Sequence, residues 1–472
     1  MSAPSRTLAL AVLCAASLMV VLDGSIVTVA LPAVQADLGF SPAGLSWTVT
    51  AYVIAFGGLM LFAGRLGDLL GRRAVFLAGL AVFTAASLLC GLAVNPGMLV
   101  AARFLQGAGG ALASAVSLGM ISVLFPAPAE RARAFGAFAF TGAAGASIGQ
   151  VLGGFLTDGL GWEAVFLINL PIGAAAIVLA LRALPADKGT GLRAGADALG
   201  AVLITGGLML GVYAIGQAGH AGWTAPGTLG AGGLAALLVA AFAVRQTRAA
   251  APLLPPRLVR VRNVWAANLV QMLMLGALFS FQVLIALYLQ NVLGYSALRT
   301  GLAMLPAAVA IGAGSLLLSA RLITRFGERA MLVTGLVLLL AARVFLARLP
   351  VDATYVVDVL PLMLLSAGFG LAMPALTGLA MSAARPEDAG VASGLFNTTQ
   401  QVGAALGVAA FTSLAAAHGG PGAEALNTGY RWGFNGGAVL LGLALLLALA
   451  LLRSPRAAAS AAGRTGRAAV SR

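Results

Sequence analysis

The first chemical feature of this sequence is an acid inside a long apolar stretch. Asp23 lies in the run Leu22-Asp-Gly-Ser-Ile-Val-Thr-Val-Ala-Leu-Pro32 and is the only carboxylate well inside any segment predicted to cross a membrane. An acid at that depth costs roughly 2.5–3.5 kcal/mol on insertion scales, so it indicates a function. Arg103 lies in another apolar segment, which runs in the opposite direction. Counting the helical rise from the segment ends places both residues at similar depth, so we expect them to approach each other.

Two roles for Asp23 and Arg103 stay open at this point. Burial favours the neutral acid, whereas a neighbouring arginine favours the charged form. Movement of Arg103 would therefore let Asp23 take up a proton, and its return would expel that proton. The alternative is a permanent ion pair that only holds two helices together. We predict proton coupling by this pair.

A second motif, Gly64-Arg-Leu-Gly-Asp-Leu-Leu-Gly-Arg-Arg73, forms the loop between two apolar segments. Its glycines allow a tight turn close to neighbouring helices. Asp68 is suited to cap the positive N-terminus of a helix that starts on the same side of the membrane as this loop. The segment that begins near Ala389 starts on that side. We predict a conformational latch between the two parts of the chain, formed by Gly64, Asp68, Gly71, Arg72 and Arg73. As an alternative, Arg72 and Arg73 serve only as topology anchors, which leaves Asp68 unexplained.

A stripe of glycines predicts close helix packing. Gly145, Gly149 and Gly153 recur at every fourth position, which is a small-xxx-small pattern. Two of these positions have counterparts later in the chain, Gly403 and Gly407.

Polar amides interrupt two later apolar segments. Amides in lipid must face protein or water, so they either bond neighbouring helices or line a cavity. The candidate cavity residues are Asn268, Gln271, Gln282, Asn397, Gln400 and Gln401. A cavity of this composition would suit bulky amphipathic ligands.

These residues must be positioned by membrane-spanning helices. Of the 472 residues, 60% are apolar and only 9% charged, and the mean hydropathy is +1.00, which excludes a soluble globular protein. Windows of about 20 apolar residues predict fourteen spans. They lie at 7–34, 46–63, 74–94, 98–124, 133–158, 162–184, 197–218, 228–245, 264–292, 299–320, 330–348, 356–384, 389–417 and 430–452.

The positive charges predict orientation rather than nucleic-acid binding. Placing both termini in the cytoplasm puts most of the 28 lysines and arginines on the inner side, as the positive-inside rule requires. The arginines predicted on the outer side are Arg299, Arg343, Arg348 and Arg431. The net charge of +14 is therefore explained by topology in the cytoplasmic membrane.

An internal repeat predicts two halves. Leu38-Gly-Phe-Ser41 recurs as Leu293-Gly-Tyr-Ser296, and the loop Arg65–Ala74 recurs in altered form as Arg321–Ala330. The predicted fold is an all-α polytopic membrane protein with two parallel six-helix repeats and two inserted central helices. Its parts are 1–190, a linker with two spans and a basic loop at 191–262, 263–453, and a cytoplasmic tail at 454–472.

No cofactor or metal is predicted. Cys14 and Cys90 lie inside apolar segments, and His220 and His418 are far apart in the sequence. The sequence contains no Gly-x-x-x-x-Gly-Lys-Ser/Thr loop, so ATP is not expected to drive the protein directly. An intramembrane enzyme would need paired acids, a Ser/His arrangement or a metal cluster, so an enzyme is not expected.

At these motifs the chain resembles the major facilitator superfamily, and specifically its fourteen-span drug–proton antiporters. The resemblance rests on Gly64–Arg73, on Leu22–Pro32, on Arg103-Phe-Leu-Gln-Gly-Ala-Gly109, on Gly142–Gly154 and on Phe166-Leu-Ile-Asn-Leu-Pro-Ile-Gly173. The motif with Arg103 resembles one whose arginine is implicated in proton transfer. Gln150 stands where the family usually has proline, and Glu163-Ala164 follows Trp162 where Arg-Trp is usual.

The resemblance implies export of an amphipathic drug or antibiotic in exchange for protons, by alternating access across the cytoplasmic membrane. The expected partners are a small organic substrate, protons and the lipid bilayer, with no nucleic acid, and a monomer is sufficient. Alternatives are proton-coupled uptake of another organic solute and a membrane sensor or scaffold without flux. Replacing Asp23 by asparagine separates them, because it abolishes proton-linked flux and leaves a scaffold role intact.

Overall fold

The computed structural model describes residues 3–40, 45, 47–187, 189–191, 197–249, 252–254, 256–295, 297–381 and 388–452. Every regular element within these ranges is a helix. Among the described residues, thirteen helical stretches are long and apolar enough to cross a membrane. The protein is therefore an all-helical, multi-span membrane protein. The predicted tail at 454–472 lies outside the described residues, as do Ser41 and Ser296 of the repeat motif.

The first group of helices contains the first two sequence motifs. It consists of α1 (Ala3–Leu38), α3 (Trp47–Leu70), α4 (Arg72–Gly91), α5 (Pro96–Leu124), α6 (Pro128–Leu160), α7 (Glu163–Leu167) and α8 (Asn169–Ala183). The 33-residue helix α6 contains the span predicted at 133–158, but it is not among the thirteen spans, so the predicted count of fourteen is not reached. Helices α7 and α8 form one span that is interrupted at Ile168.

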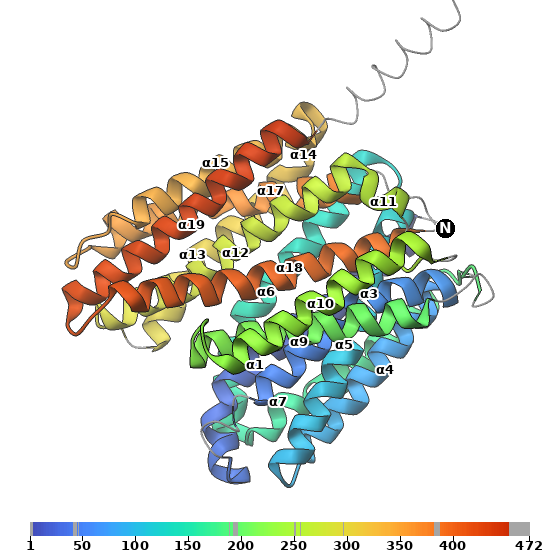
Figure 1. Cartoon of the computed structure of the whole chain (residues 1–472), viewed down its shortest axis with the longest axis horizontal. Helices are drawn as coiled ribbons and strands as arrows, with labels where there is room; N and C mark the ends of the chain where they lie inside the picture. The colour runs from blue at the N-terminus through green and yellow to red at the C-terminus, as the bar shows by residue number, and fades with distance from the viewer. Residues whose placement is uncertain are drawn as a thin grey trace, which may run out of the picture.

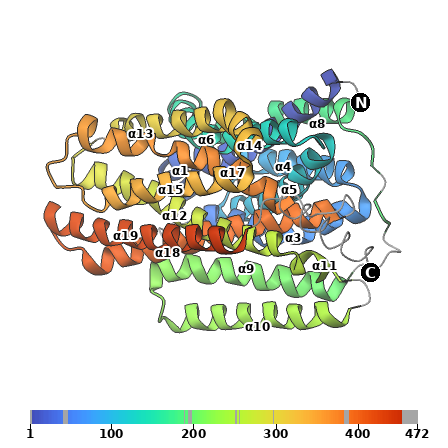
Figure 2. The same ribbon diagram turned by 90° about the horizontal axis from the view of Figure 1, so that it is seen from above.

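Two inserted helices lie along one side of the molecule. Helix α9 (Ala198–Ala221) packs on α3, and α10 (Pro226–Arg248) packs on α9 and is outermost in Figure 2. Asp197 joins the two: it accepts hydrogen bonds from the Gly200 N–H (2.8 Å), Arg245 Nε (2.5 Å) and Gln246 Nε2 (2.9 Å). Burial alone would raise the pKa of Asp197, but these hydrogen bonds outweigh it and hold the pKa below its usual value.

The last group of helices follows a short helix, α11 (Pro256–Arg260). It consists of α12 (Arg262–Asn291), α13 (Ala297–Gly312), the π-helical turn η2 (Ala313–Leu318), α14 (Ser319–Phe326), α15 (Glu328–Leu346), the π-helical turn η3 (Tyr355–Val359), α16 (Leu360–Leu364), α17 (Ala367–Met381), α18 (Ala389–His418) and α19 (Ala423–Leu451). Figure 1 shows the first group in blue and cyan on one side and the last group in orange and red on the other.

Glycines bring equivalent helices together in both groups. A Cβ atom added to Gly149 of α6 would lie 2.9 Å from the Leu22 carbonyl oxygen of α1. In the last group, Gly407 of α18 contacts the backbone of Gly276 of α12 in the same way. At both places the helix axes approach too closely for any larger residue, because backbone packs directly on backbone.

The two groups meet at the end of the bundle where α1 and α18 begin, which we call the closed end. The N-terminus of α18 lies against the last turns of α3 and α5, where Gly64 contacts Gly390 and Gly119 contacts Ala389. Near the same end, the Ser315 hydroxyl donates a 2.8 Å hydrogen bond to the Gly136 carbonyl oxygen of α6. This packing positions the loop motif against the opposite group.

Candidate functional site: a buried acid network and an interdomain latch

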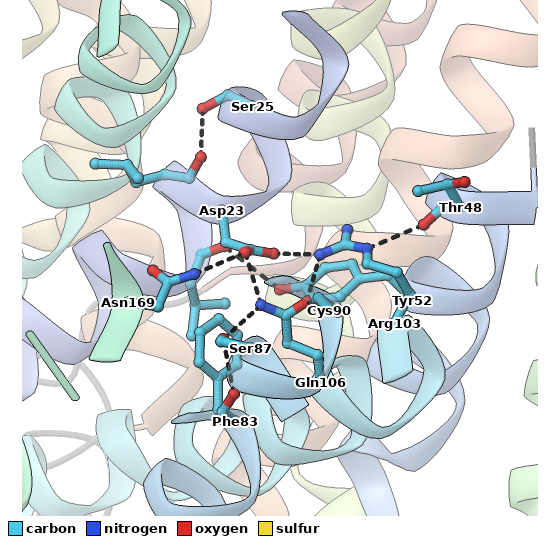
Figure 3. A network of polar contacts seen from close by, with 12 residues as sticks. Asp23, Ser25, Thr48, Tyr52, Phe83, Ser87, Cys90, Arg103, Gln106 and Asn169 are labelled. Atoms are coloured by element: carbon cyan, nitrogen blue, oxygen red, sulfur yellow. Dashed lines mark hydrogen bonds and ion pairs between the residues drawn. The ribbon is translucent and has the colours of Figure 1, made fainter. Parts of the chain in front are cut away.

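The centre of the candidate site is an ion pair within the first group. Arg103 Nη1 of α5 donates to Asp23 Oδ2 of α1 over 2.6 Å, and the two residues are only 1% and 0% exposed. Figure 3 shows that both side chains point into the space between their helices. The structure thus brings together the two residues whose depth predicted an encounter. Their role in proton coupling stays a prediction.

Two amides complete the surroundings of the carboxylate. Gln106 Nε2 of α5 donates to Asp23 Oδ1 over 2.7 Å, and Asn169 Nδ2 donates to the same oxygen over 2.9 Å (Figure 3). Gln106 Nε2 also donates to the Ser87 hydroxyl of α4 over 2.8 Å. All three partners are fully buried. Both carboxylate oxygens of Asp23 therefore accept hydrogen bonds, as a buried carboxylate requires.

These three residues were absent from the predicted site. Gln106 lies one helical turn after Arg103, so the i, i+3 spacing within the same motif was an available signal. Asn169 is the first residue of α8, directly after the interruption at Ile168, and stands within the quoted motif Phe166–Gly173. Ser87 had no comparable signal, because small hydroxyl residues are common in spans.

The guanidinium of Arg103 has further partners on α3. Its Nε donates to the Thr48 carbonyl oxygen over 3.0 Å, and its Cζ lies 4.3 Å from the centroid of the Tyr52 ring. The ring of Phe166 lies 5.7 Å from the same atom. Arg103 thus has contacts on α3 that do not depend on Asp23.

Within the described ranges no three His, Cys, Asp or Glu side chains are grouped to hold an ion. Cys90 lies beside the network, where its Sγ is 3.6 Å from Gln106 Oε1.

The loop motif forms a bridge between the two groups of helices. Asp68 Oδ1 accepts from the Gly390 N–H over 2.9 Å, and Oδ2 accepts from the Val391 N–H over 2.8 Å. Arg72 Nη2 donates to Asp68 Oδ1 over 3.1 Å. The carboxylate therefore binds the first free N–H groups of α18, where the helix dipole is positive.

The remaining latch candidates have different places. Gly71 has φ of 99°, which favours glycine, and ends α3 in a tight turn into α4. The N–H of Arg72 and the N–H of Arg73 both donate to the Asp187 carboxylate, over 2.8 and 3.1 Å. The Arg73 guanidinium donates to the Leu181 carbonyl oxygen over 2.6 Å, so it ties α4 to α8 within the first group.

The glycines of α6 lie against α1. A Cβ atom on Gly145 would lie 3.1 Å from the Val21 side chain, and one on Gly153 would lie 2.8 Å from the Ile26 carbonyl oxygen. Together with Gly149, they allow α6 to contact the helix that carries Asp23. The side chain of Gln150 lies outside the described residues.

Most of the candidate cavity amides bond neighbouring helices. Asn268 Oδ1 and Gln271 Oε1 of α12 accept from the Thr399 hydroxyl of α18, over 2.8 and 3.2 Å. Gln271 Nε2 donates to Gln400 Oε1 over 3.4 Å. These three amides therefore form interhelical hydrogen bonds, and a role in lining a cavity stays a prediction.

Two of the other amides, Asn397 and Gln401, lie at the boundary between the groups. Asn397 Nδ2 donates to the Ser114 carbonyl oxygen of α5 over 3.3 Å and so crosses that boundary. Gln401 is half-buried, and its Cβ lies close to Gly57 of α3. Gln282 is half-buried on α12. Their part in substrate binding stays a prediction.

One of the arginines predicted on the outer side of the membrane is buried within the helix bundle. The sequence placed Arg343 on the outer side with Arg348, but Arg343 is 3% exposed inside the last group, whereas Arg348 is exposed. Arg343 lies in the last turn of α15 and faces the bundle, whereas Arg348 follows the end of that helix.

A bundle of spanning helices in two groups, with an ion pair fully buried between two of them, is typical of a membrane carrier. Residues 13–408 match the Major Facilitator Superfamily. A puromycin resistance protein of Streptomyces alboniger is 40% identical over 409 residues, which are 86% of this chain and 81% of that protein. A cephamycin export protein of Amycolatopsis lactamdurans is 41% identical over 411 residues, which are 86% and 84% of the two chains.

The chain belongs to the Major Facilitator Superfamily. The structure of a human organic anion transporter has a TM-score of 0.70 with this structure, over 94% of this chain and 99% of that chain, at 16% identity, which shows a likeness of fold alone. The predicted resemblance is confirmed for the superfamily, and the fourteen-span subgroup stays a prediction. The protein is a small-molecule transporter of a membrane rather than an enzyme.

Proposed function

We propose that the protein exports an amphipathic antibiotic or related drug across the cytoplasmic membrane in exchange for protons. Relatives that are named for puromycin resistance and cephamycin export support the export of antibiotics. A probable actinorhodin transporter of Streptomyces coelicolor, 39% identical over 87% of this chain, supports the same class. No cofactor is required, because the proton gradient drives the exchange, and one copy of the chain is sufficient.

The observation that carries proton coupling is the complete burial of Asp23 beside Arg103. A proton can neutralise the acid only when Asp23 and Arg103 move apart. The carboxyl group would then retain Gln106 and Asn169 as neighbours, while Arg103 would keep the Thr48 carbonyl oxygen and the Tyr52 ring. Protonation therefore weakens the attachment between α1 and α5 and leaves that between α5 and α3 in place.

Helix α3 is suited to transmit this change to the latch. Thr48, which accepts from Arg103, and Asp68, which binds α18, are 20 positions apart on one helix, or about 30 Å. A tilt of α3 at the acid network would displace Asp68 from the N-terminus of α18. Loss of these two hydrogen bonds would open the closed end, which is how alternating access would follow from proton uptake.

The number of membrane spans and the side on which the termini lie are part of this proposal. We take α6 as a fourteenth span, because its 33 residues pack along α1, itself a span. With fourteen spans both termini lie in the cytoplasm, and the closed end is the cytoplasmic one. The positive-inside bias of the sequence supports this orientation.

The test uses inside-out membrane vesicles with an imposed proton gradient and a pH-sensitive dye. Puromycin, a cephamycin, lipophilic cations and dyes are added in turn to vesicles with and without the protein. We expect at least one compound to release protons only when the protein is present. If no compound does so, and intact cells accumulate a compound faster with the protein than without it, export is refuted and uptake takes its place.

A further inference from the structure

The last group of helices contains a buried cation with incomplete bonding. Arg343 of α15 donates through Nη2 to the Ala277 carbonyl oxygen and, over 2.7 Å, to the Ser280 hydroxyl, both of α12. Its Nη1 is buried and has no hydrogen-bond partner. Among the ion pairs formed by the described residues, none includes Arg343.

The surroundings of Arg343 accommodate the charge but do not neutralise it. The rings of Phe281 and Phe434 lie 5.6 and 5.5 Å from its Cζ, so π-electron faces partly stabilise the guanidinium. Gly437 of α19 leaves space for it, since a Cβ there would lie 2.6 Å from Nη2. Carbonyl oxygens, hydroxyls and ring faces carry no full negative charge. A buried arginine without a counter-ion is costly in a membrane protein.

A small cavity adjoins this guanidinium. It is lined by Arg343 with apolar side chains of α12, α15 and α19 and with Ser366, which precedes α17. Its free space holds about one particle the size of a water molecule or a small ion, and no drug-sized molecule. Arg343 lies three residues before the end of α15, about 4.5 Å along the helix from the end opposite the closed one.

In the first group, the position equivalent to Arg343 lies in a network that contains an acid. Arg72–Ala74 of α4 correspond to Glu328–Ala330 of α15 at an offset of 256, and this offset carries Ser87 onto Arg343. Ser87 belongs to the network in which Asp23 neutralises Arg103. The last group therefore also buries a cation, from a different helix, but the ion pairs of the described residues include no acid that neutralises it.

We propose that this cavity binds a small monovalent inorganic anion, chloride under physiological conditions, as the counter-ion of Arg343. The unpartnered Nη1 provides one donor for the anion, and the Ser366 hydroxyl lines the same space. The size of the cavity excludes the substrate itself and large carboxylates. This site is separate from the acid network and does not depend on the transport proposal.

The test measures thermal unfolding of the purified full-length protein in detergent at constant ionic strength. Sodium gluconate is replaced stepwise by sodium chloride, bromide or nitrate. We expect a saturable rise of the unfolding temperature on the order of 2–5 °C in the three small anions. The rise is expected to be lost in Arg343→Gln and kept in Arg348→Gln, which removes an exposed charge five residues further along the chain.

Two results would overturn the proposal. The first is an equal unfolding temperature of the wild type in chloride and in gluconate. The second is a chloride-dependent rise that persists in Arg343→Gln. Because that variant can fail to fold, equilibrium binding of radioactive chloride is measured on the wild type and on Ser280→Val. Saturable binding near one ion per chain that weakens at least about tenfold in Ser280→Val supports the site, and absence of saturable binding to the wild type refutes it.

Discussion

Replacement of Asp23 by asparagine tests the centre of the mechanism with a side chain of nearly the same shape. In the wild type, Oδ2 accepts from Arg103 while Oδ1 accepts from Gln106 and Asn169. An asparagine has one acceptor oxygen and one NH2 group. If its oxygen faces the two amides, its NH2 group meets the Arg103 guanidinium; if it is flipped, its NH2 group meets two NH2 groups. Either orientation sets donor against donor.

The expected loss of stability follows from this conflict. Removing one partner of a buried ion pair typically destabilises a protein by about 3–5 kcal/mol, because the other charge stays buried. The Thr48 carbonyl oxygen and the Tyr52 ring stay beside Arg103, so we expect a value near the lower end, about 3 kcal/mol. The double variant Asp23→Asn/Arg103→Gln removes the unpaired charge and is expected to recover part of this loss.

Two assays separate stability from coupling. Unfolding in detergent is measured for the wild type, for Asp23→Asn and for the matched control Asp37→Asn, which makes the same change at an exposed position of α1. The same proteins are reconstituted in liposomes for substrate-driven proton release and for exchange of labelled substrate without a gradient. We expect Asp23→Asn to lose proton release and keep gradient-free exchange, and Asp37→Asn to keep both.

One result would refute the reasoning. If folded Asp23→Asn protein releases protons on substrate addition as fast as the wild type, then Asp23 is not the proton carrier. The ion pair with Arg103 would then only hold α1 and α5 together.

Three further changes test other parts of the structure. Asp68→Asn leaves one acceptor oxygen for the two N–H groups of α18, so we expect slower transport. A cysteine introduced by Ser114→Cys, at the boundary between the groups, is then expected to react faster with maleimide because the boundary opens. An unchanged labelling rate contradicts the latch. Gly149→Ala is expected to lower the unfolding temperature because α1 fills the space that a Cβ atom would need. Gly154→Ala is the control and is expected to leave the unfolding temperature unchanged, since a Cβ atom there would have no neighbour within 4 Å. Equal effects of the two changes refute this packing. At pH values above the usual aspartate pKa, the interactions of Asp197 stabilise the fold. This stabilisation is lost as the pH falls through the lower pKa that Asp197 has in the folded protein. The difference in unfolding temperature between the wild type and Asp197→Asn should therefore shrink between about pH 5 and pH 2, and a constant difference contradicts this.

Several features followed from the sequence because they depend on local periodicity. Hydropathy located the spanning helices, and the helical rise placed Asp23 and Arg103 at similar depth. The charge and position of Asp68 predicted its partner, the start of α18, since free N–H groups at a helix N-terminus attract an acid.

Features that depend on which helix faces touch were decided only by the tertiary structure. Gln106 and Asn169 bind the same oxygen of Asp23 although their positions are 63 apart in the chain, and no single helix records that convergence. Arg343 and Arg348 look alike in the sequence, yet one is buried and the other exposed. The amides of α12 bond Thr399 and Gln400 of α18 because the Gly276–Gly407 contact brings these helices together. Sequence periodicity describes one helix at a time, whereas burial and bonding in a bundle are set by the rotation of each helix relative to its neighbours.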